Sequence, residues 1–146
     1  MYKITEEIYV GGITTAEEVK HNKIKCVIFL SNATTDYPGY NYQIFDSSGN
    51  DPKQFIKILE AIDKHIKAKD IPIFLNCGMG ISRSPVIAAL WLYHDNRFKS
   101  FDEALEFVHN RSKVTLKGVE AMPNPKLITF VKEKVIPLLN KTKKDN

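Results

Sequence analysis

Cysteine is scarce in this chain, with two residues among 146, Cys26 and Cys77. Two cysteines exclude a disulfide framework of the kind that holds small secreted domains together. No apolar run approaches the roughly 18 residues that a membrane-spanning helix needs, and no apolar stretch follows a basic start. We therefore expect no membrane span and an intracellular protein, cytoplasmic or nuclear, where a thiol stays reduced.

The chain also lacks a large excess of positive or negative charge. Its net charge is only +4, and part of that charge lies in the C-terminal lysines. So diffuse a charge favours anionic substrates but does not indicate a nucleic-acid partner. The chain contains no internal repeat, low-complexity linker or sign of a second domain. The sequence predicts one domain over residues 1–140 with a sizeable core, followed by a flexible basic tail over 141–146.

Short apolar runs predict strands at residues 4–10, 25–31, 42–45 and 71–75. Helical spacing of apolar residues predicts helices that begin after Thr14 or Thr15, at Asp51-Pro52, at Ser84-Pro85, after Ser100 and after Pro125. The helix after Ser84 is apolar almost all round, which is typical of a central, buried helix. This order predicts an α/β fold, a single domain with a central, mostly parallel or mixed sheet of about five strands and helices on both faces.

The most informative segment joins a predicted strand to this apolar helix and reads Asn76-Cys77-Gly78-Met79-Gly80-Ile81-Ser82-Arg83-Ser84-Pro85. Backbone N–H groups of a loop that leads into a helix can wrap a dianion, and the helix N-terminus adds positive potential. Arg83 supplies a planar fork for two phosphate oxygens. At the bottom of such a cradle Cys77 would be favoured as a thiolate able to attack phosphorus. The alternative is an ordinary turn with an inert, buried Cys77.

The segment resembles the signature loop of the cysteine-dependent protein phosphatases, in particular the small dual-specificity class, whose pattern is H-C-x-x-G-x-x-R-[ST]. The residues in register are Cys77, Gly80, Ser82, Arg83 and Ser84. The opening residues 8–12 also resemble the first strand of that family, so the resemblance extends over the whole chain. The histidine position holds Asn76, which can hydrogen-bond the backbone but cannot carry charge. We therefore expect an active enzyme whose thiolate is less stabilised than in relatives with the histidine.

The resemblance implies a two-step reaction without metal or cofactor, in which Cys77 attacks and a general acid protonates the leaving oxygen. It assigns the acid to Asp46, while Asp51 is better explained as a helix N-cap. Ser84 would help the thiolate leave in the second step. A helix N-cap before Pro85 is its other role, and the two roles can coexist. The phosphate would be bound by the loop residues Gly78, Met79, Gly80, Ile81, Ser82 and Arg83.

The resemblance also implies phosphorylated proteins as partners, with phosphotyrosine and also phosphoserine or phosphothreonine as substrates. The sequence leaves the oligomeric state open, with a monomer favoured. Alternatives with the same loop are a phosphatase of RNA 5′ ends or phosphoinositides and a phosphate-binding pseudophosphatase. The first two tend to have extra lysines or Arg-Thr-Gly in the loop, which this chain lacks. Residues 112–122 depart from the family pattern, either to shape substrate choice or as a neutral insertion. Cys26 is expected in the core, with a protective disulfide to Cys77 as the alternative.

Overall fold

The computed structural model describes residues 1–114 and 120–144 and has a five-stranded sheet in the order β1-β2-β5-β3-β4. The strands are β1 (Tyr2–Lys3), β2 (Ile8–Gly11), β3 (Cys26–Phe29), β4 (Tyr40–Asn41) and β5 (Ile73–Asn76). β1 pairs antiparallel with β2, and the other pairs are parallel. The predicted single α/β domain with a mixed sheet is therefore confirmed.

The helices are α1 (Ala16–His21), α2 (Pro52–Lys67), α3 (Arg83–His94), α4 (Phe101–Ser112), α5 (Pro125–Phe130), the π-helical turn η1 (Val131–Val135) and α6 (Ile136–Lys144). Three caps predicted from the sequence are confirmed, because the side chains of Thr15, Asp51 and Ser100 each accept a hydrogen bond from a backbone N–H in the first turn. α6 continues through Lys144, so the part of the expected tail that the structure describes is helical.

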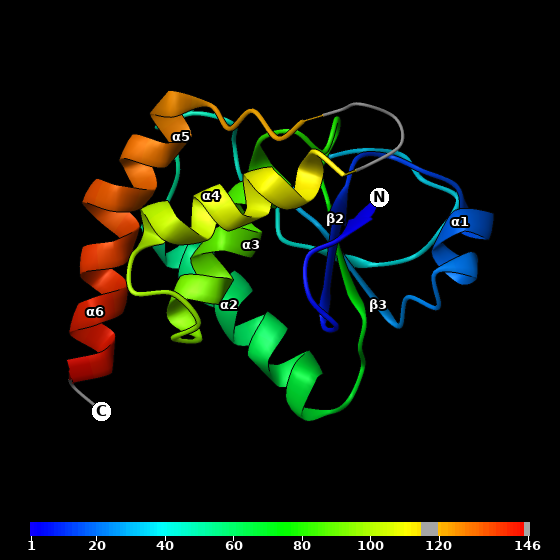
Figure 1. Cartoon of the computed structure of the whole chain (residues 1–146), viewed down its shortest axis with the longest axis horizontal. Coiled ribbons are helices and arrows are strands. Elements are labelled where there is room, and N and C mark those ends of the chain that lie inside the picture. Colours follow the sequence, from blue (N-terminus) through cyan, green and yellow to red (C-terminus); the bar gives the residue numbers. More distant parts are fainter. Residues whose placement is uncertain (115–119, 145–146) are drawn as a thin grey trace.

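The two faces of the sheet are covered unequally (Figure 1). Val27, Phe29 and Phe74 form a small cluster on the face covered by α1 and by the loop that contains Tyr37. The remaining helices lie on the opposite side, where the large core cluster includes Ile28 and the buried residues of α2 and α3. The prediction of helices on both faces is correct, with α1 alone on the thinner side.

The central helix α3 lies between the sheet and α4, and it contacts β2, β5 and α2 as well. All residues from Ser84 to Leu92 are buried, which agrees with the apolar character of this helix on every side. α3 begins at Arg83 rather than at Ser84-Pro85. Its first turn lies at the carboxyl edge of the sheet, directly after the loop that follows β5.

Two strand predictions were wrong in their bounds. The run 4–10 is interrupted, because the backbone N–H groups of Ile4 and Thr5 both donate to the Ile8 carbonyl and turn the chain from β1 into β2. The run 42–45 is not a strand, and β4 precedes it. Tyr42 and Ile44 still donate backbone hydrogen bonds to the carbonyls of Phe29 and Leu30, so the segment follows β3 without regular pairing. Across the described ranges, no helix is long and apolar enough to cross a membrane.

Candidate active site

The loop from Cys77 to Ser82 joins β5 to α3 at the carboxyl edge of the sheet, in the crevice where α/β proteins commonly bind ligands. β5 lies between β2 and β3, so the loop begins in the middle of this edge. The Cys77 N–H donates to the Gly11 carbonyl at 3.2 Å, and the Ile13 N–H donates to the Gly78 carbonyl at 3.2 Å. These bonds hold the first part of the loop against the end of β2.

Gly80 shows why this loop needs glycine. Its φ angle is +72°, and a Cβ atom there would lie 2.2 Å from the Gly12 nitrogen and 2.4 Å from the Gly11 carbonyl carbon. Two backbone segments therefore cross without room for any side chain. The crossing closes the loop around the position of Cys77.

Cys77 lies at the floor of the loop with its side chain 2% exposed. Its Sγ atom is 3.2 Å from Ser84 Oγ and accepts a hydrogen bond from the Ser84 N–H at 3.4 Å. Ser84 is fully buried in the first turn of α3, where the helix N-terminus favours negative charge. The helix N-cap is Ser82, so the alternative role of Ser84 as the cap was wrong. This arrangement can stabilise a sulfur anion.

Arg83 lies between the signature loop and the segment that leads to Asp46. A Cβ atom built on Gly78 would be 3.5 Å from a guanidinium nitrogen of Arg83, so the side chain turns back toward the start of the loop. Its Nη1 atom lies 3.5 Å from the Ile44 carbonyl, the limit of a weak hydrogen bond. A guanidinium in this position can offer two parallel donors to a phosphate held in the loop.

Asp46 is attached to the same loop although it lies 36 residues before Ser82. The Ser82 hydroxyl donates to its carboxylate at 2.6 Å, and the Asn124 side chain donates to its carbonyl at 2.7 Å. The Asn124 N–H also donates to Ser82 Oγ at 2.8 Å. Asp51, the other carboxylate of this segment, caps α2 through the Lys53 N–H. The two carboxylates therefore have separate positions and separate local roles.

A comparison with family models matches residues 8–130 to the dual specificity phosphatase catalytic domain. The chain belongs to this family. It is therefore a cysteine-based phosphatase. A sequence comparison with curated proteins finds no match.

Solved structures of phosphatases show the same fold. Human DUSP28 has 17% identity to the chain and a TM-score of 0.78, over 97% of this chain and 99% of that one. PTPMT1 has 16% identity and a TM-score of 0.78, over 99% of each chain. Cydia pomonella PTP-2 phosphatase has 17% identity and a TM-score of 0.74, over 91% of this chain and 88% of that one.

In this dual-specificity phosphatase the position before the cysteine holds Asn76, which is completely buried. Its Nδ2 group donates to the Gly12 carbonyl at 2.8 Å and to the Tyr37 hydroxyl at 3.1 Å, while the Thr14 N–H donates to the same hydroxyl. Asn76 therefore braces the segment that crosses Gly80, as the histidine of the family pattern would brace its loop. Tyr37 and Asn124 were missed by sequence reasoning, because their partners are distant in the chain.

Tyr2 is a further residue that the sequence did not indicate. Burial raises the pKa of its hydroxyl, and the nearby Cys77 sulfur raises it further. The Tyr2 hydroxyl has no hydrogen-bond partner within the described part of the chain.

Cys26 lies at the other end of the sheet, paired with Ile73 in register, whereas Cys77 follows the end of β5. Cys77 lies four residues along the strand from Ile73, the partner of Cys26, which corresponds to about 13 Å. A disulfide needs Cα atoms within about 7 Å of each other. The structure therefore excludes a direct Cys26–Cys77 disulfide without rearrangement of the sheet. Burial, with a contribution from Asp70, raises the pKa of Cys26 to about 11, as expected for an inert core thiol.

The structure describes both ends of the segment 112–122, which departs from the family pattern. Residues 115–119 lie outside the described part. The Met122 N–H donates to the Ile81 carbonyl at 2.7 Å, so the segment returns directly to the signature loop. Val114 lines a cleft of about 780 Å³ together with Gly78, Met79 and Gly80. Among the described residues, no three His, Cys, Asp or Glu side chains are grouped to hold a metal ion.

Proposed function

We propose that this phosphatase hydrolyses phosphotyrosine, and also phosphoserine and phosphothreonine, in protein substrates through a cysteinyl-phosphate. The observation that carries this proposal is the position of Cys77 Sγ, buried at the loop floor with the Ser84 hydroxyl 3.2 Å away. In this mechanism Arg83 and the backbone N–H groups from Gly78 to Arg83 bind the three non-bridging oxygens.

In the first step the Cys77 thiolate forms a bond to phosphorus while the bond from phosphorus to the substrate oxygen breaks. The Asp46 carboxylic acid gives its proton to that leaving oxygen, so the product is an alcohol or phenol. The hydrogen bonds of Asp46 to Ser82 and of its backbone to Asn124 support this assignment, because they hold the carboxyl group beside the phosphate loop.

In the second step the Asp46 carboxylate takes a proton from water, whose oxygen attacks phosphorus as the bond from sulfur to phosphorus breaks. Inorganic phosphate and the thiolate are the products, and Asp46 is again protonated. The Ser84 hydroxyl would donate a hydrogen bond to the sulfur as negative charge returns to it. The two steps together require no oxidant, reductant or metal ion.

A phosphoinositide is a second candidate substrate, because one solved structure with this fold is of PTPMT1 in complex with PI(5)P, at 14% identity and a TM-score of 0.76. The absence of lysine between Cys77 and Arg83 argues against a highly charged inositol phosphate in this chain. Protein substrates therefore remain the first proposal.

The experiment is hydrolysis of an aryl phosphate in the presence of a metal chelator, followed across pH for the parent, Cys77→Ser and Asp46→Asn. We expect no turnover with Cys77→Ser and a steep loss with Asp46→Asn. Phosphotyrosine, phosphothreonine and phosphoinositide substrates then rank the classes by kcat/KM. A folded parent that binds vanadate without turning over any of them would contradict the proposal and favour a phosphate-binding pseudophosphatase.

A further inference from the structure

Large exposed hydrophobic side chains gather around the mouth of the signature loop. Five of them form what we call the apolar collar, with exposed fractions of 52% for Ile13, 56% for Phe45, 76% for Met79, 73% for Val114 and 70% for Met122. Among the described residues the other large hydrophobic side chain with such exposure is Tyr40. Exposed apolar residues are ordinary when scattered, but a group of them marks a binding surface.

Backbone contacts place the collar beside the loop. The Ile13 N–H donates to the Gly78 carbonyl, and the Met122 N–H donates to the Ile81 carbonyl. Phe45 directly precedes Asp46, whose carboxylate accepts from Ser82, and Met79 belongs to the loop itself. Four different segments of the chain thus bring one apolar residue each to the edge of the phosphate site.

On one flank the collar continues into a cavity. Ile13, Met79 and Val114 are among the residues that line the cleft of about 780 Å³, together with Gly78 and Gly80. A side chain that neighbours the phosphorylated residue of a substrate could enter this cleft while the phosphate lies in the loop. Because the signature loop itself forms part of the cleft, the cleft would select side chains by shape and apolar area.

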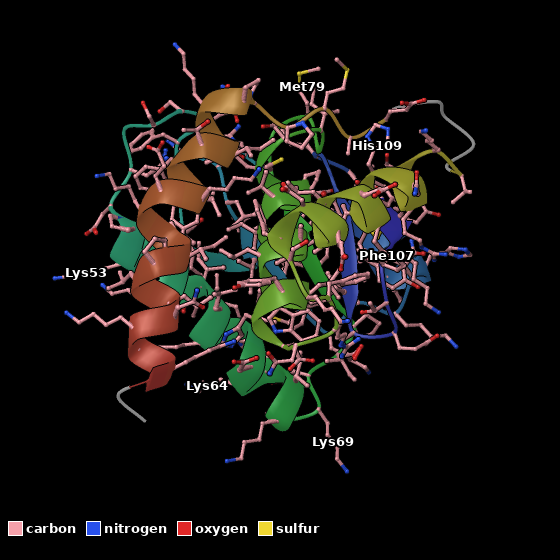
Figure 2. The ribbon with its side chains drawn as sticks, turned by 60° about the vertical axis from the view of Figure 1, so that its left-hand side comes forward. Lys53, Lys64, Lys69, Met79, Phe107 and His109 are labelled. Carbon is pink, nitrogen blue, oxygen red and sulfur yellow. The ribbon has the colours of Figure 1, made fainter. Side chains whose placement is uncertain are left out.

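The paired charges that line the cleft favour a peptide over an anionic lipid surface. Figure 2 shows Met79 at one end of the molecule, whereas Lys64 and Lys69 lie at the opposite end and Lys53 on the side. The charged groups that line the cleft include the Met1 ammonium, which lies 3.6 Å from the Glu18 carboxylate, as well as Lys3 and Arg111. The Lys3 ammonium is bound to Glu6 at 2.6 Å, and the Arg111 Nε donates to the Lys3 carbonyl. A membrane-binding face would need basic residues around its apolar tip.

We infer that the apolar collar selects phosphorylated peptide segments whose neighbouring residues are large and apolar. This inference rests on the proposed function, since it names the protein substrates of the same site. Side chains such as leucine or phenylalanine on either side of the phosphorylated residue would be buried against Ile13, Phe45 and Met122, with one of them in the cleft. Peptides with acidic or small polar neighbours would lose that burial and bind more weakly.

The test compares two phosphotyrosine peptides of equal length, one with leucine and phenylalanine beside the phosphorylated residue and one with serine at both places. We expect kcat/KM to be about tenfold higher for the apolar peptide. Ile13→Ser and Met122→Ser should each remove a large part of this ratio while turnover of a small aryl phosphate stays within about twofold of the parent.

Tyr40→Ser is the matched control, because Tyr40 is 53% exposed but packs against His65 with a ring separation of 4.9 Å. His65 lies in the last turn of α2, roughly 20 Å along that helix from Pro52. Tyr40→Ser should leave the peptide ratio unchanged. Far-UV circular dichroism and thermal unfolding verify that each variant is folded.

Equal kcat/KM for the two peptides, or the same ratio in Ile13→Ser as in Tyr40→Ser, would overturn the inference while aryl phosphate turnover still supported the proposed function. Faster hydrolysis of a phosphoinositide in phosphatidylserine vesicles, lost in Ile13→Ser, would instead assign the collar to a membrane. Concentration-dependent dimerisation that is lost in Ile13→Ser, with no change in peptide ratio, would assign it to a second copy of the chain. Absence of all turnover would contradict the proposed function itself.

Discussion

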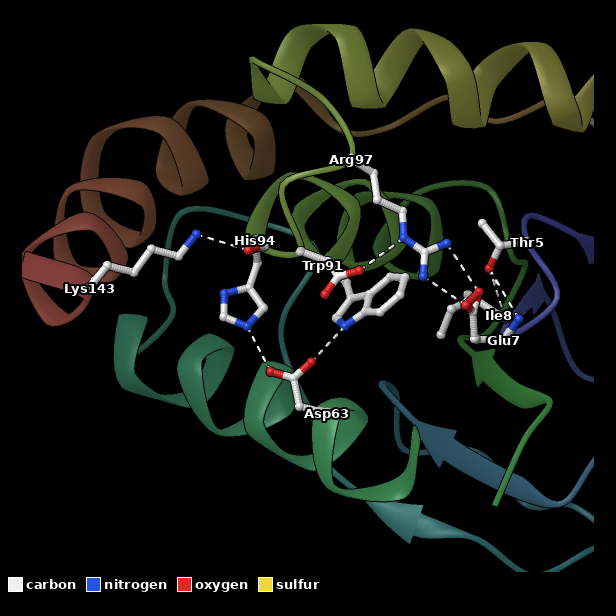
Figure 3. Close-up of polar contacts among 9 residues, drawn as sticks. Thr5, Glu7, Ile8, Asp63, Trp91, His94, Arg97 and Lys143 are labelled. Atoms are coloured by element: carbon white, nitrogen blue, oxygen red, sulfur yellow. Dashed lines mark hydrogen bonds and ion pairs between the residues drawn. The ribbon is translucent and has the colours of Figure 1, made fainter. Parts of the chain in front are cut away.

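The polar side chains near the two ends of α3 differ in how they are paired. At its C-terminal end the polar side chains of Glu7, Asp63, Trp91, His94 and Arg97, which we call the distal cluster, bind one another (Figure 3). The Asp63 carboxylate accepts from the Trp91 indole at 3.0 Å and contacts His94 Nε2 at 2.7 Å. Arg97 donates two hydrogen bonds to Glu7 and lies 4.7 Å from the centre of the Trp91 ring.

At the N-terminal end the described residues of the site form hydrogen bonds but no ion pair. Cys77 and Ser84 bind each other, and Asp46 is exposed, with its carboxylate accepting from the Ser82 hydroxyl. Within the described ranges, buried polar atoms without a hydrogen-bond partner are Tyr2 Oη, Ser31 Oγ, Asn76 Oδ1 and His94 Nδ1. The first three lie at the carboxyl edge of the sheet and one at the distal cluster. Because unpaired buried polar atoms destabilise a fold, we expect the distal cluster to contribute more to stability than the N-terminal end of α3.

Among the substitutions that keep the Cys77 nucleophile, Asp46→Asn should have the largest effect on catalysis. The amide keeps an acceptor for the Ser82 hydroxyl but cannot act as a general acid. The kcat for an alkyl phosphate should therefore fall about 10²–10³-fold. Steady-state kinetics measure this loss. Asp51→Asn, with a cap residue of similar quality, should keep both activity and stability. Comparable losses of kcat in the two variants would show that the acid is misassigned.

Gly80→Ala tests whether the crossing of two backbones holds the site together. A methyl group 2.2 Å from the Gly12 nitrogen at φ +72° cannot be accommodated without movement of the loop. We expect vanadate affinity and kcat/KM to fall about 10²-fold or more, since small displacements in a site are costly. The control is Gly49→Ala, where the nearest atom would be 3.6 Å away. Unchanged vanadate binding in Gly80→Ala would refute this account of the loop.

Asn124→Ala removes the hydrogen bond to the Asp46 carbonyl and should release the segment that contains the acid. We expect kcat for an alkyl phosphate to fall about tenfold, with a much smaller effect on an aryl phosphate whose leaving group needs less protonation. Asn124 also caps α5 by accepting from the Lys126 N–H. Asn124→Asp keeps an acceptor for that cap but loses the donor, so it separates the two roles. Full activity of Asn124→Asp would mean that the donor does not position Asp46.

Arg97→Met tests the distal cluster and should change stability without changing kcat. Loss of the ion pairs and of the contact with Trp91 should lower the free energy of unfolding by about 1–2 kcal/mol. The hydrogen bond from Arg97 lowers the pKa of Glu7. This stabilisation is therefore present above the ordinary glutamate pKa of about 4.3 and is lost as the pH falls through the lowered value.

Denaturant unfolding of parent and Arg97→Met at several pH values provides the measurement. The difference in stability should be largest near neutral pH and should shrink in acid. Lys99→Met, on the same connection, is the control for loss of a cation, and it should have little effect. A difference that stays constant down to acid pH would show that packing on Trp91, not the pair with Glu7, accounts for it.

The sequence was informative where the signal is local. The apolar runs of β3 and β5, the caps at Asp51 and Ser100, and the buried α3 follow from neighbouring residues alone. Cys77 and Ser84 lie on one loop and its helix, so their proximity could be expected. The interruption of the first strand could not, because it depends on hydrogen bonds to Ile8 that alternate hydrophobicity does not reveal.

The sequence did not indicate which residues far apart in the chain are hydrogen-bond partners. The Ser82 hydroxyl joins Asp46 to Asn124, across 36 and 42 residues, and nothing in the local pattern of any of these segments indicates the others. The contact of Asn76 with Tyr37 likewise depends on how the loop before β4 folds over the sheet. The assignment of catalytic roles to Cys77, Arg83, Asp46 and Ser84 stays a prediction until it is measured.

The most direct test of the central claim is to trap the intermediate. Asp46→Asn, which should be slow in the second step, is mixed with an aryl phosphate that has a good leaving group, quenched in acid and digested for mass spectrometry. We predict one phosphoryl group on the peptide that contains Cys77, attached to its sulfur, and none in Asp46→Asn combined with Cys77→Ser. Release of the aryl alcohol without any phosphorylated enzyme, or a phosphoryl group on another residue, would contradict the account.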